Sequence, residues 1–269
     1  MMPTRTKPAF ASTLYKGKFV GVFLLFHVFV AQLLLWKEYG PVVGSMHGLW
    51  VCSVSILLCA YGMLANNATA VAASMVAVST GHFLWTIDTM YMGWTWSSDT
   101  IFDIASFNSV NGEPTRETIY TTSHHIWFIP LCVWWLRGMG ERLEFKHLLW
   151  SALWILAVSA GTACVVPMEC VPWDSPDGYV CFDLNINMVK KWWGLEDVYL
   201  FHFLDRNNGT HALIFYCYAN FIHDFVFNGF WWSLLKIAVN GLEWEEEEEE
   251  EEGKVEAGGK KNKRKDKKQ

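Results

Sequence analysis

The stretch FVGVFLLFHVFVAQLLLW, residues 19–36, predicts a helix that crosses a membrane. It contains no Asp, Glu, Lys or Arg, and it is close to the length of about 20 residues that spans the hydrocarbon core of a bilayer as a helix. Five further apolar stretches have a comparable length. They are residues 48–64, 69–92, 120–136, 148–166 and 211–239. The sequence therefore predicts an all-α, polytopic membrane bundle with about six transmembrane helices, which together make one domain over residues 1–242.

The composition agrees with a chain that lives in a lipid bilayer. Of the 269 residues, 52% are hydrophobic and 18% are charged, whereas about a quarter of a soluble domain is charged. The net charge of −6 depends on eight consecutive Glu at residues 245–252. No extended basic face occurs in the body of the chain, so nucleic acid is excluded as a partner. The partner that the sequence predicts is the bilayer itself.

Lys and Arg in the short flanking segments predict the orientation, because they collect on the cytoplasmic side. With six spans, the basic N-terminus, the loop after the fourth span and the Lys-rich C-terminus all fall on one side. Residues 243–269 then form a disordered, charged cytosolic tail, since blocks of like charge repel one another. Lys265 and Lys267 near its end resemble a dilysine retrieval signal. We therefore expect the endoplasmic reticulum or another endomembrane, with the plasma membrane as the alternative.

A long segment between the fifth and sixth spans falls on the opposite, lumenal side. Cys170 and Cys181 both lie in it, and an oxidising lumen would let them form a disulfide. Asn208 begins an Asn-Gly-Thr sequon in the same segment, so it is the candidate site of glycosylation.

Polar side chains recur at helical spacing inside two of the predicted spans. In the sixth span, Asn220, Asp224 and Asn228 are four residues apart and share one face, with His223 beside them. In the third span, one face carries Ser79, His82, Thr86 and Thr89, and Asp88 lies off it toward the lumenal end. A carboxylate inside a membrane costs about 2.5–3.5 kcal/mol on insertion scales, so such groups usually face the bundle interior and pair.

The first and fourth spans add His27, His124 and His125 at similar depths. The sequence thus predicts that four spans converge on one polar pocket that opens to the lumen. Its candidate catalytic residues are His82, Asp88, His125, His223 and Asp224. The alternative is structural, because Asn, His, Ser and Thr also hold membrane helices together at about 0.6 kcal/mol per hydrogen bond.

Several chemistries fit such a pocket. A His–Asp pair can act as a general base toward a lipid ester or alcohol. Imidazoles with a carboxylate can bind zinc or iron, and opposed His can hold a haem, but no HExxH motif or repeated His box occurs. The metal and the cofactor therefore stay undetermined. Asp and His chains also relay protons in transporters.

Four segments resemble an uncharacterised family of multi-pass integral membrane proteins. They are GHFLWTIDTMYMG, DTIFDIASF, SHHIWFIPLCVWWLRGMG and LNINMVKKWWG, between Gly81 and Gly194. The chain departs from the family pattern in Ser-His-His, where Phe-His is expected, and in Met188, where Trp is expected. The resemblance implies a shared fold and a shared site around His82, Trp85, Asp88 and His125. It implies no activity.

The function that we expect from the sequence is that of a membrane protein whose lumen-facing pocket binds or acts on a lipid or lipophilic small molecule. The competing classes are a proton- or ion-coupled transporter, and a structural or assembly subunit without a catalytic site.

Overall fold

The computed structural model describes residues 7–95, 101, 116–175, 178–182, 205–206 and 209–241. The predicted tail at residues 243–269 and the predicted glycosylation site at Asn208 lie outside the described residues.

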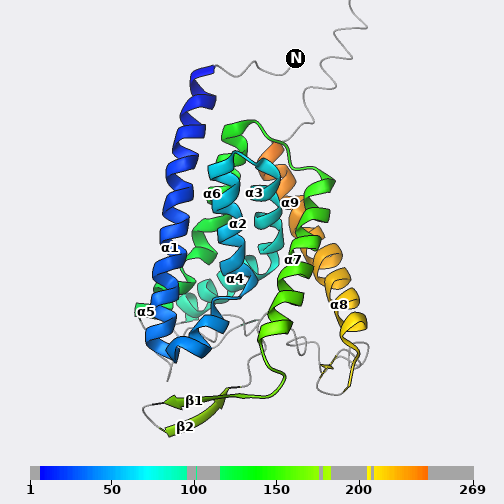
Figure 1. The fold of residues 1–269 in the computed structure, drawn as a ribbon. Helices are drawn as coiled ribbons and strands as arrows, with labels where there is room; N and C mark the ends of the chain where they lie inside the picture. The colour runs from blue at the N-terminus through cyan, green and yellow to red at the C-terminus, as the bar shows by residue number, and fades with distance from the viewer. Residues whose placement is uncertain are drawn as a thin grey trace, which may run out of the picture.

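The described chain is a bundle of helices with one short hairpin at one end (Figure 1). The helices are α1 (Lys7–His47), α2 (Val51–Ala65), α3 (Ala68–Ala77), α4 (Ser79–Thr95), α5 (Arg116–Thr122), α6 (His124–Met139), α7 (Phe145–Val165), α8 (Ala212–Asn220), η5 (Phe221–Asn228) and α9 (Gly229–Asn240). The hairpin pairs β1 (Val171–Ser175) with β2 (Gly178–Phe182) in antiparallel register.

Helices lie over all six of the apolar stretches that the sequence singled out. Two of the described helices are long and apolar enough to cross a membrane, Ser12–His47 and Phe145–Val165. A third candidate is the pair α3 and α4, which meet at a bend of 50° and together have the length and composition of a span. The prediction of a helical bundle is therefore confirmed, two or three of the described helices have the length and composition of membrane spans, and the count of six is not confirmed.

The outer surface of the bundle is apolar, and its interior is an apolar core that also holds polar side chains. Large apolar side chains are exposed along the outer faces of α1, α7 and the α8–α9 rod, among them Phe19, Phe26, Leu153 and Phe230. The core is built from apolar side chains such as Ile56, Met75, Phe128 and Trp135. The buried polar side chains of the described residues are His27, Ser55, Ser74, Ser79, Thr80, His82, Asp88, His124, His147, Ser151, Ser159, Thr162, Asp224 and Asn228. A protein that folds in water normally keeps exposed apolar patches small.

Two details of the structure depart from a set of regular helices. The segment after α7 forms the β1–β2 hairpin, so it departs from helix. A proline usually ends or kinks a helix, yet α6 runs through Pro130 from His124 to Met139. A proline inside a membrane helix is tolerated when neighbouring groups compensate for the hydrogen bond that it removes.

Close packing of α1 against α2 requires a residue without a side chain at Gly21. A Cβ atom built there would lie 2.8 Å from Leu64 Cγ and 3.1 Å from the Ala60 carbonyl oxygen. Small residues at such crossings let the helix backbones approach closely, which is the main source of helix association within lipid.

At the break between α3 and α4, the side chain of Asn228 from another helix forms hydrogen bonds with both half-helices. Its carboxamide oxygen accepts hydrogen bonds from Thr80 N at 3.3 Å, from Thr80 Oγ1 at 2.6 Å and from Ser79 Oγ at 3.2 Å. Its Nδ2 donates to the Ala77 carbonyl oxygen at 3.4 Å and to Asp224 Oδ1 at 3.0 Å. Asn228 therefore serves the carboxyl end of one half-helix and the amino end of the other. Backbone groups freed in a membrane helix need such partners, because lipid offers none.

The segment that carries Asn228 is itself irregular. Residues Phe221–Asn228 form a π-helix, η5, between α8 and α9. A π-helix has i to i+5 hydrogen bonds, so each of its turns holds an extra residue. His223 and Asn228 are five residues apart and consequently approach within 3.2 Å, measured from Nδ1 to Nδ2. Regular α-helical spacing would place these two side chains farther apart around the axis.

Asn228→Leu is expected to lower the free energy of unfolding by about 2 kcal/mol or more. The substitution leaves buried groups of α3, α4 and η5 without partners, and each such group costs about 1–3 kcal/mol. Asn220→Leu is the matched control, because the amide of Asn220 donates to the Tyr216 carbonyl oxygen of its own helix. Thermal unfolding in detergent micelles measures both variants, and equal losses would contradict the bridging role of Asn228.

Candidate functional site

Four histidines from three helices meet inside the bundle, and we call them the imidazole cluster: His27, His82, His124 and His125. The ring centroid of His82 lies 5.4 Å from that of His124 and 4.5 Å from that of His125. The rings of His124 and His125 are 4.2 Å apart, and that of His27 lies 6.0 Å from His124. The helices α1, α4 and α6 therefore bring together side chains that are far apart in the sequence.

The nitrogens of this cluster are largely without hydrogen-bond partners. His82 is 1% exposed, and both its Nδ1 and its Nε2 are buried with no partner in the structure. His27 is 3% exposed, and its Nε2 is in the same state. A buried polar atom without a partner is costly, so its presence in a native fold calls for an explanation. An imidazole that merely held helices together would be bonded to a neighbour.

His125 is held in a defined orientation. In the tautomer with a proton on Nδ1, this nitrogen donates to the Thr122 carbonyl oxygen at 2.8 Å. The ring stacks on that of Trp85, with centroids 4.8 Å apart and an interplanar angle of 22°. Nε2 is then left with a lone pair for another partner. A backbone carbonyl that orients one ring nitrogen is the usual support of a metal-binding histidine.

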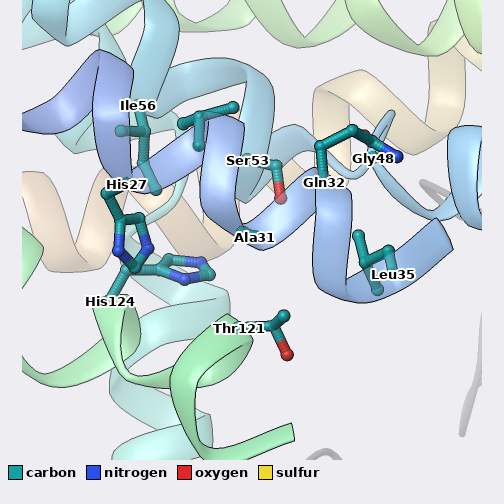
Figure 2. A pocket seen from close by; sticks show the side chains of 10 residues that line it. His27, Ala31, Gln32, Leu35, Gly48, Ser53, Ile56, Thr121 and His124 are labelled. Carbon is teal, nitrogen blue, oxygen red and sulfur yellow. The ribbon is translucent and has the colours of Figure 1, made fainter. Parts of the chain in front are cut away.

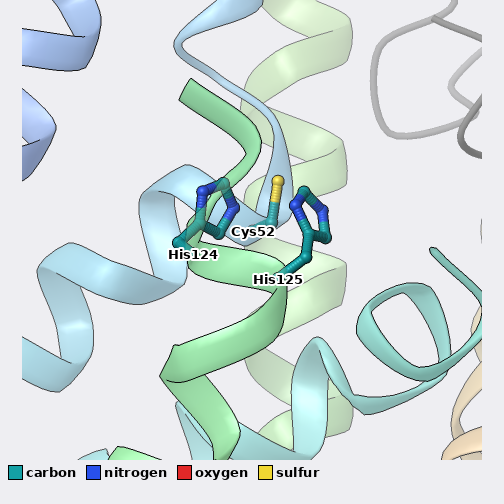
Figure 3. Close-up of side chains that lie close together, drawn as sticks. All are labelled: Cys52, His124 and His125. Carbon is teal, nitrogen blue, oxygen red and sulfur yellow. The ribbon is translucent and has the colours of Figure 1, made fainter. Parts of the chain in front are cut away.

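Cys52, in the first turn of α2, lies beside two of these histidines. One ligand atom each from Cys52, His124 and His125 falls within 4.8 Å of the others. In Figure 3, the sulfur of Cys52 is seen between the two imidazole rings. Cys52 is a free, half-buried thiol. This arrangement could hold a metal ion, since thiolate and imidazole are the preferred ligands of zinc.

A small cavity opens next to the imidazole cluster (Figure 2). His27 and His124 line one side, and Gln32, Ser53 and Thr121 supply further polar groups. Its volume of about 20 Å³ is enough for a water molecule or one small polar group. Apolar side chains of α1 and α2 complete the wall.

A second polar group surrounds Asn228, and we call it the amide cluster: Ser79, Thr80, His223, Asp224 and Asn228. Asp224 is fully buried, and its Oδ1 accepts from Asn228 Nδ2 and lies 3.5 Å from His223 Nδ1. The other carboxylate oxygen, Oδ2, is buried without a hydrogen-bond partner. Like the imidazole cluster, the amide cluster thus contains a buried polar atom without a hydrogen-bond partner, Oδ2 of Asp224.

The predicted site residues consequently lie in three places. His82 and His125 belong to the imidazole cluster, and His223 and Asp224 belong to the amide cluster. Asp88 is buried, and its Oδ1 accepts a hydrogen bond from Ile101 N at 2.9 Å, which ties the chain after α4 to the bundle. The two clusters are linked through α4, since His82 follows Ser79 by three residues and so lies on the same face, about 4.5 Å along the axis.

The candidate disulfide lies at the hairpin. Cys170, just before β1, is disulfide-bonded. The register of the hairpin places Pro172 opposite Cys181, so the two cysteines are near one another in the backbone. The side chain of Cys181 is outside the described residues, and the pairing of Cys170 with Cys181 stays a prediction.

Two of the functional candidates were not singled out from the sequence. Cys52 lies within an apolar stretch of the sequence, and no CxxC or other motif marks it. Thr80 lies off the polar face that was predicted for the third span. Cys52 joins the imidazole cluster because it follows the turn between α1 and α2, and Thr80 joins the amide cluster because it follows the α3–α4 break. The helical period of the sequence predicts neither.

Comparison of the chain with family models, with curated proteins and with solved structures gives no match. Of the four residues that the family resemblance places in a shared site, the structure brings His82, Trp85 and His125 together, and Asp88 accepts from the Ile101 backbone instead.

His82→Leu is expected to leave the stability of the protein unchanged or to raise it by about 1 kcal/mol when a chelator is present. Leucine has a similar size and removes two buried nitrogens that have no partners, and such a replacement is neutral or stabilising. Thermal unfolding in EDTA measures the change. If the substitution lowers the free energy of unfolding by more than about 1 kcal/mol, the side chain of His82 helps to hold the helices together.

Proposed function

We propose that this protein is a six-span membrane protein whose buried polar site binds or acts on a lipid or lipophilic small molecule. The observation that carries the proposal is the set of unpartnered imidazole nitrogens, above all those of His82, inside a bundle with an apolar exterior. Ionisable groups at such a depth are expensive and usually mark a pathway or a site.

The course of the chain supports six crossings. Going from α1 through α2, α3–α4, α5–α6 and α7 to α8–α9, the path reverses direction at each step, and both ends of the described chain lie at the same end of the bundle (Figure 1). The segments α8, η5 and α9 follow one another without a gap from Ala212 to Asn240. They form a rod that is long enough to cross, since about 20 helical residues suffice.

The distribution of basic residues supports the proposed orientation. Lys16 and Lys18 on α1, and Arg137 and Arg142 near the α6–α7 connection, lie toward the end of the bundle where the described chain starts. By the positive-inside rule this end is cytoplasmic. The imidazole cluster lies toward the other end, near α5, which would be lumenal. The endoplasmic reticulum or a related endomembrane remains the proposed location.

The size of the cavity suggests how a lipophilic molecule would be held. About 20 Å³ admits a hydroxyl or carbonyl group but no acyl chain. The outer face of α1 beside it is apolar, with Phe26 and Phe29 each 60% exposed. A lipid could therefore place one polar group beside His27 and His124 while its chain lies along α1. A neutral imidazole at hydrogen-bond distance from a hydroxyl can accept its proton as a general base.

A proton-coupled transporter is the second candidate, and the link through α4 favours it. His82 and Ser79 share a face, and Ser79 bonds to Asn228, which bonds to Asp224. Polar groups thus continue from the imidazole cluster into the middle of the bundle. Chains of Asp and His are the usual proton relays of membrane pumps.

The full chain, purified in particles of its native membrane, is expected to retain a lipophilic molecule that His27→Ala loses, because His27 lines the cavity and its Nε2 has no partner. Mass spectrometry of the extracted lipids, normalised to the bulk membrane, measures the enrichment. The expected loss is about fivefold, because a single buried hydrogen bond of about 1 kcal/mol changes binding by that factor. Ser151→Ala is the matched control, since the buried hydroxyl of Ser151 bonds to Leu148 of its own helix. An unchanged lipid profile in His27→Ala, with the protein folded, contradicts the proposal.

Cysteines introduced at the two ends of the bundle should be labelled from opposite sides of a sealed vesicle. Glu141 lies in the exposed connection between α6 and α7, and Met168 lies, 39% exposed, between α7 and β1. A membrane-impermeant maleimide should modify Glu141→Cys and Met168→Cys in vesicles of opposite orientation, with the wild-type chain as the blank. Labelling of both from one side would exclude α7 as a crossing helix.

A further inference from the structure

We infer that Cys52, His82, His124 and His125 form a binding site for a zinc ion. The inference goes beyond the proposed function, since it assigns an inorganic ligand to the imidazole cluster and does not require a lipophilic one. The four residues come from three helices, with Cys52 on α2, His82 on α4 and both His124 and His125 on α6.

The spacing of the ligand atoms is close to that of a tetrahedral site. Zinc bonds of about 2.3 Å to sulfur and 2.0–2.1 Å to nitrogen place neighbouring ligand atoms roughly 3.3–3.6 Å apart. Ligand atoms of Cys52, His124 and His125 already lie within 4.8 Å of one another. A contraction of at most about 1.5 Å would bring them to bonding distance.

The ring positions agree with a third histidine ligand. Two imidazoles bound to one tetrahedral ion have ring centroids roughly 5 Å apart, given the bond lengths above. His82 lies 5.4 Å from His124 and 4.5 Å from His125 by this measure. The nitrogens of His82 lie outside the group of ligand atoms that Cys52, His124 and His125 form, so a shift of its ring is needed for it to become the fourth ligand.

The hydrogen bonding supplies an independent observation. His82 is almost completely buried, and neither of its nitrogens has a partner, so a lone pair is free for a metal. The Nδ1 of His125 is engaged by the Thr122 carbonyl oxygen, which directs the lone pair of Nε2 away from the backbone. An ion would satisfy groups that the protein alone leaves unsatisfied.

The donor set favours zinc over the other common ions. One thiolate and three imidazoles are borderline-soft ligands, which suit zinc, whereas magnesium and calcium require oxygen ligands. Binding deprotonates the Cys52 thiol: the S–H bond is lost, a Zn–S bond forms, and the proton leaves to solvent with no change of oxidation state. A bound ion would join α2, α4 and α6 near the α5 end of the bundle.

Metal titration of the purified full chain tests the site directly. After treatment with EDTA and removal of the chelator, the protein is expected to bind about one Zn²⁺ per chain, measured by elemental analysis. Saturation at 100 times the dissociation constant should raise the apparent stability by about 2.7 kcal/mol, seen as a higher unfolding temperature. Co²⁺ in place of Zn²⁺ should give the strong visible bands of four-coordinate cobalt and a thiolate-to-cobalt charge-transfer band.

Paired variants identify the ligands. Cys52→Ser should abolish the charge-transfer band and weaken Zn²⁺ binding at least tenfold, whereas Cys217→Ser, which removes an exposed free thiol of α8, should change neither. His82→Leu should weaken binding to a similar degree. His47→Leu is its control, because His47 lies on α1 and stacks on Tyr39, outside the cluster. The unfolding temperature in EDTA shows whether each variant has folded.

The outcomes separate this inference from the proposed function. Binding of Zn²⁺ that is unchanged in Cys52→Ser, or no binding by the folded wild-type chain, overturns the zinc site. Zinc binding that survives in His82→Leu at full strength removes His82 from the ligand set and overturns the four-ligand site. The lipid enrichment is measured separately in EDTA-treated particles, so either proposal can fail while the other stands.

Discussion

The hydrogen bonds of the Asn228 carboxamide join three segments of the bundle, α3, α4 and η5. A bundle in lipid has no water to satisfy the backbone where a helix breaks. The α3–α4 break nevertheless lies inside the bundle, and Asn228 meets the backbone of both half-helices there. The bend that results sets the direction of α4, and hence the place of His82.

The irregularity of η5 belongs to the same arrangement. Its wider turn lets His223, Asp224 and Asn228 face the break together, which three residues on a regular helix could not do equally well. A π-helix gives up good backbone geometry, and in membrane proteins as elsewhere it tends to occur at functional positions. The hydrogen bonds of the amide cluster therefore give it a structural role at the α3–α4 break. That role does not explain why Oδ2 of Asp224 is buried without a partner.

The imidazole cluster differs in kind. Its members touch one another through their rings rather than through hydrogen bonds, and His82 in particular contributes no bond that would hold the helices. Burying such groups lowers stability, and either of the ligands proposed above would offset that cost. The proposed lipid places a polar group in the adjacent cavity, and the proposed zinc ion is held with Cys52, so the two draw on different atoms of the same cluster.

Apolar length and helical period are local properties, so they predict the helical class, the approximate positions of the helices and the His and Asp residues within them. They also predict one pocket for His82, Asp88, His125, His223 and Asp224, of which the structure brings His82 and His125 into ring contact and groups His223 and Asp224 elsewhere, around Asn228. The division into two clusters, the role of Asn228 at the break and the approach of Cys52 follow from tertiary contacts. Each depends on a departure from regular helix geometry or on a contact between residues far apart in the chain, and a helical period read along one segment contains neither.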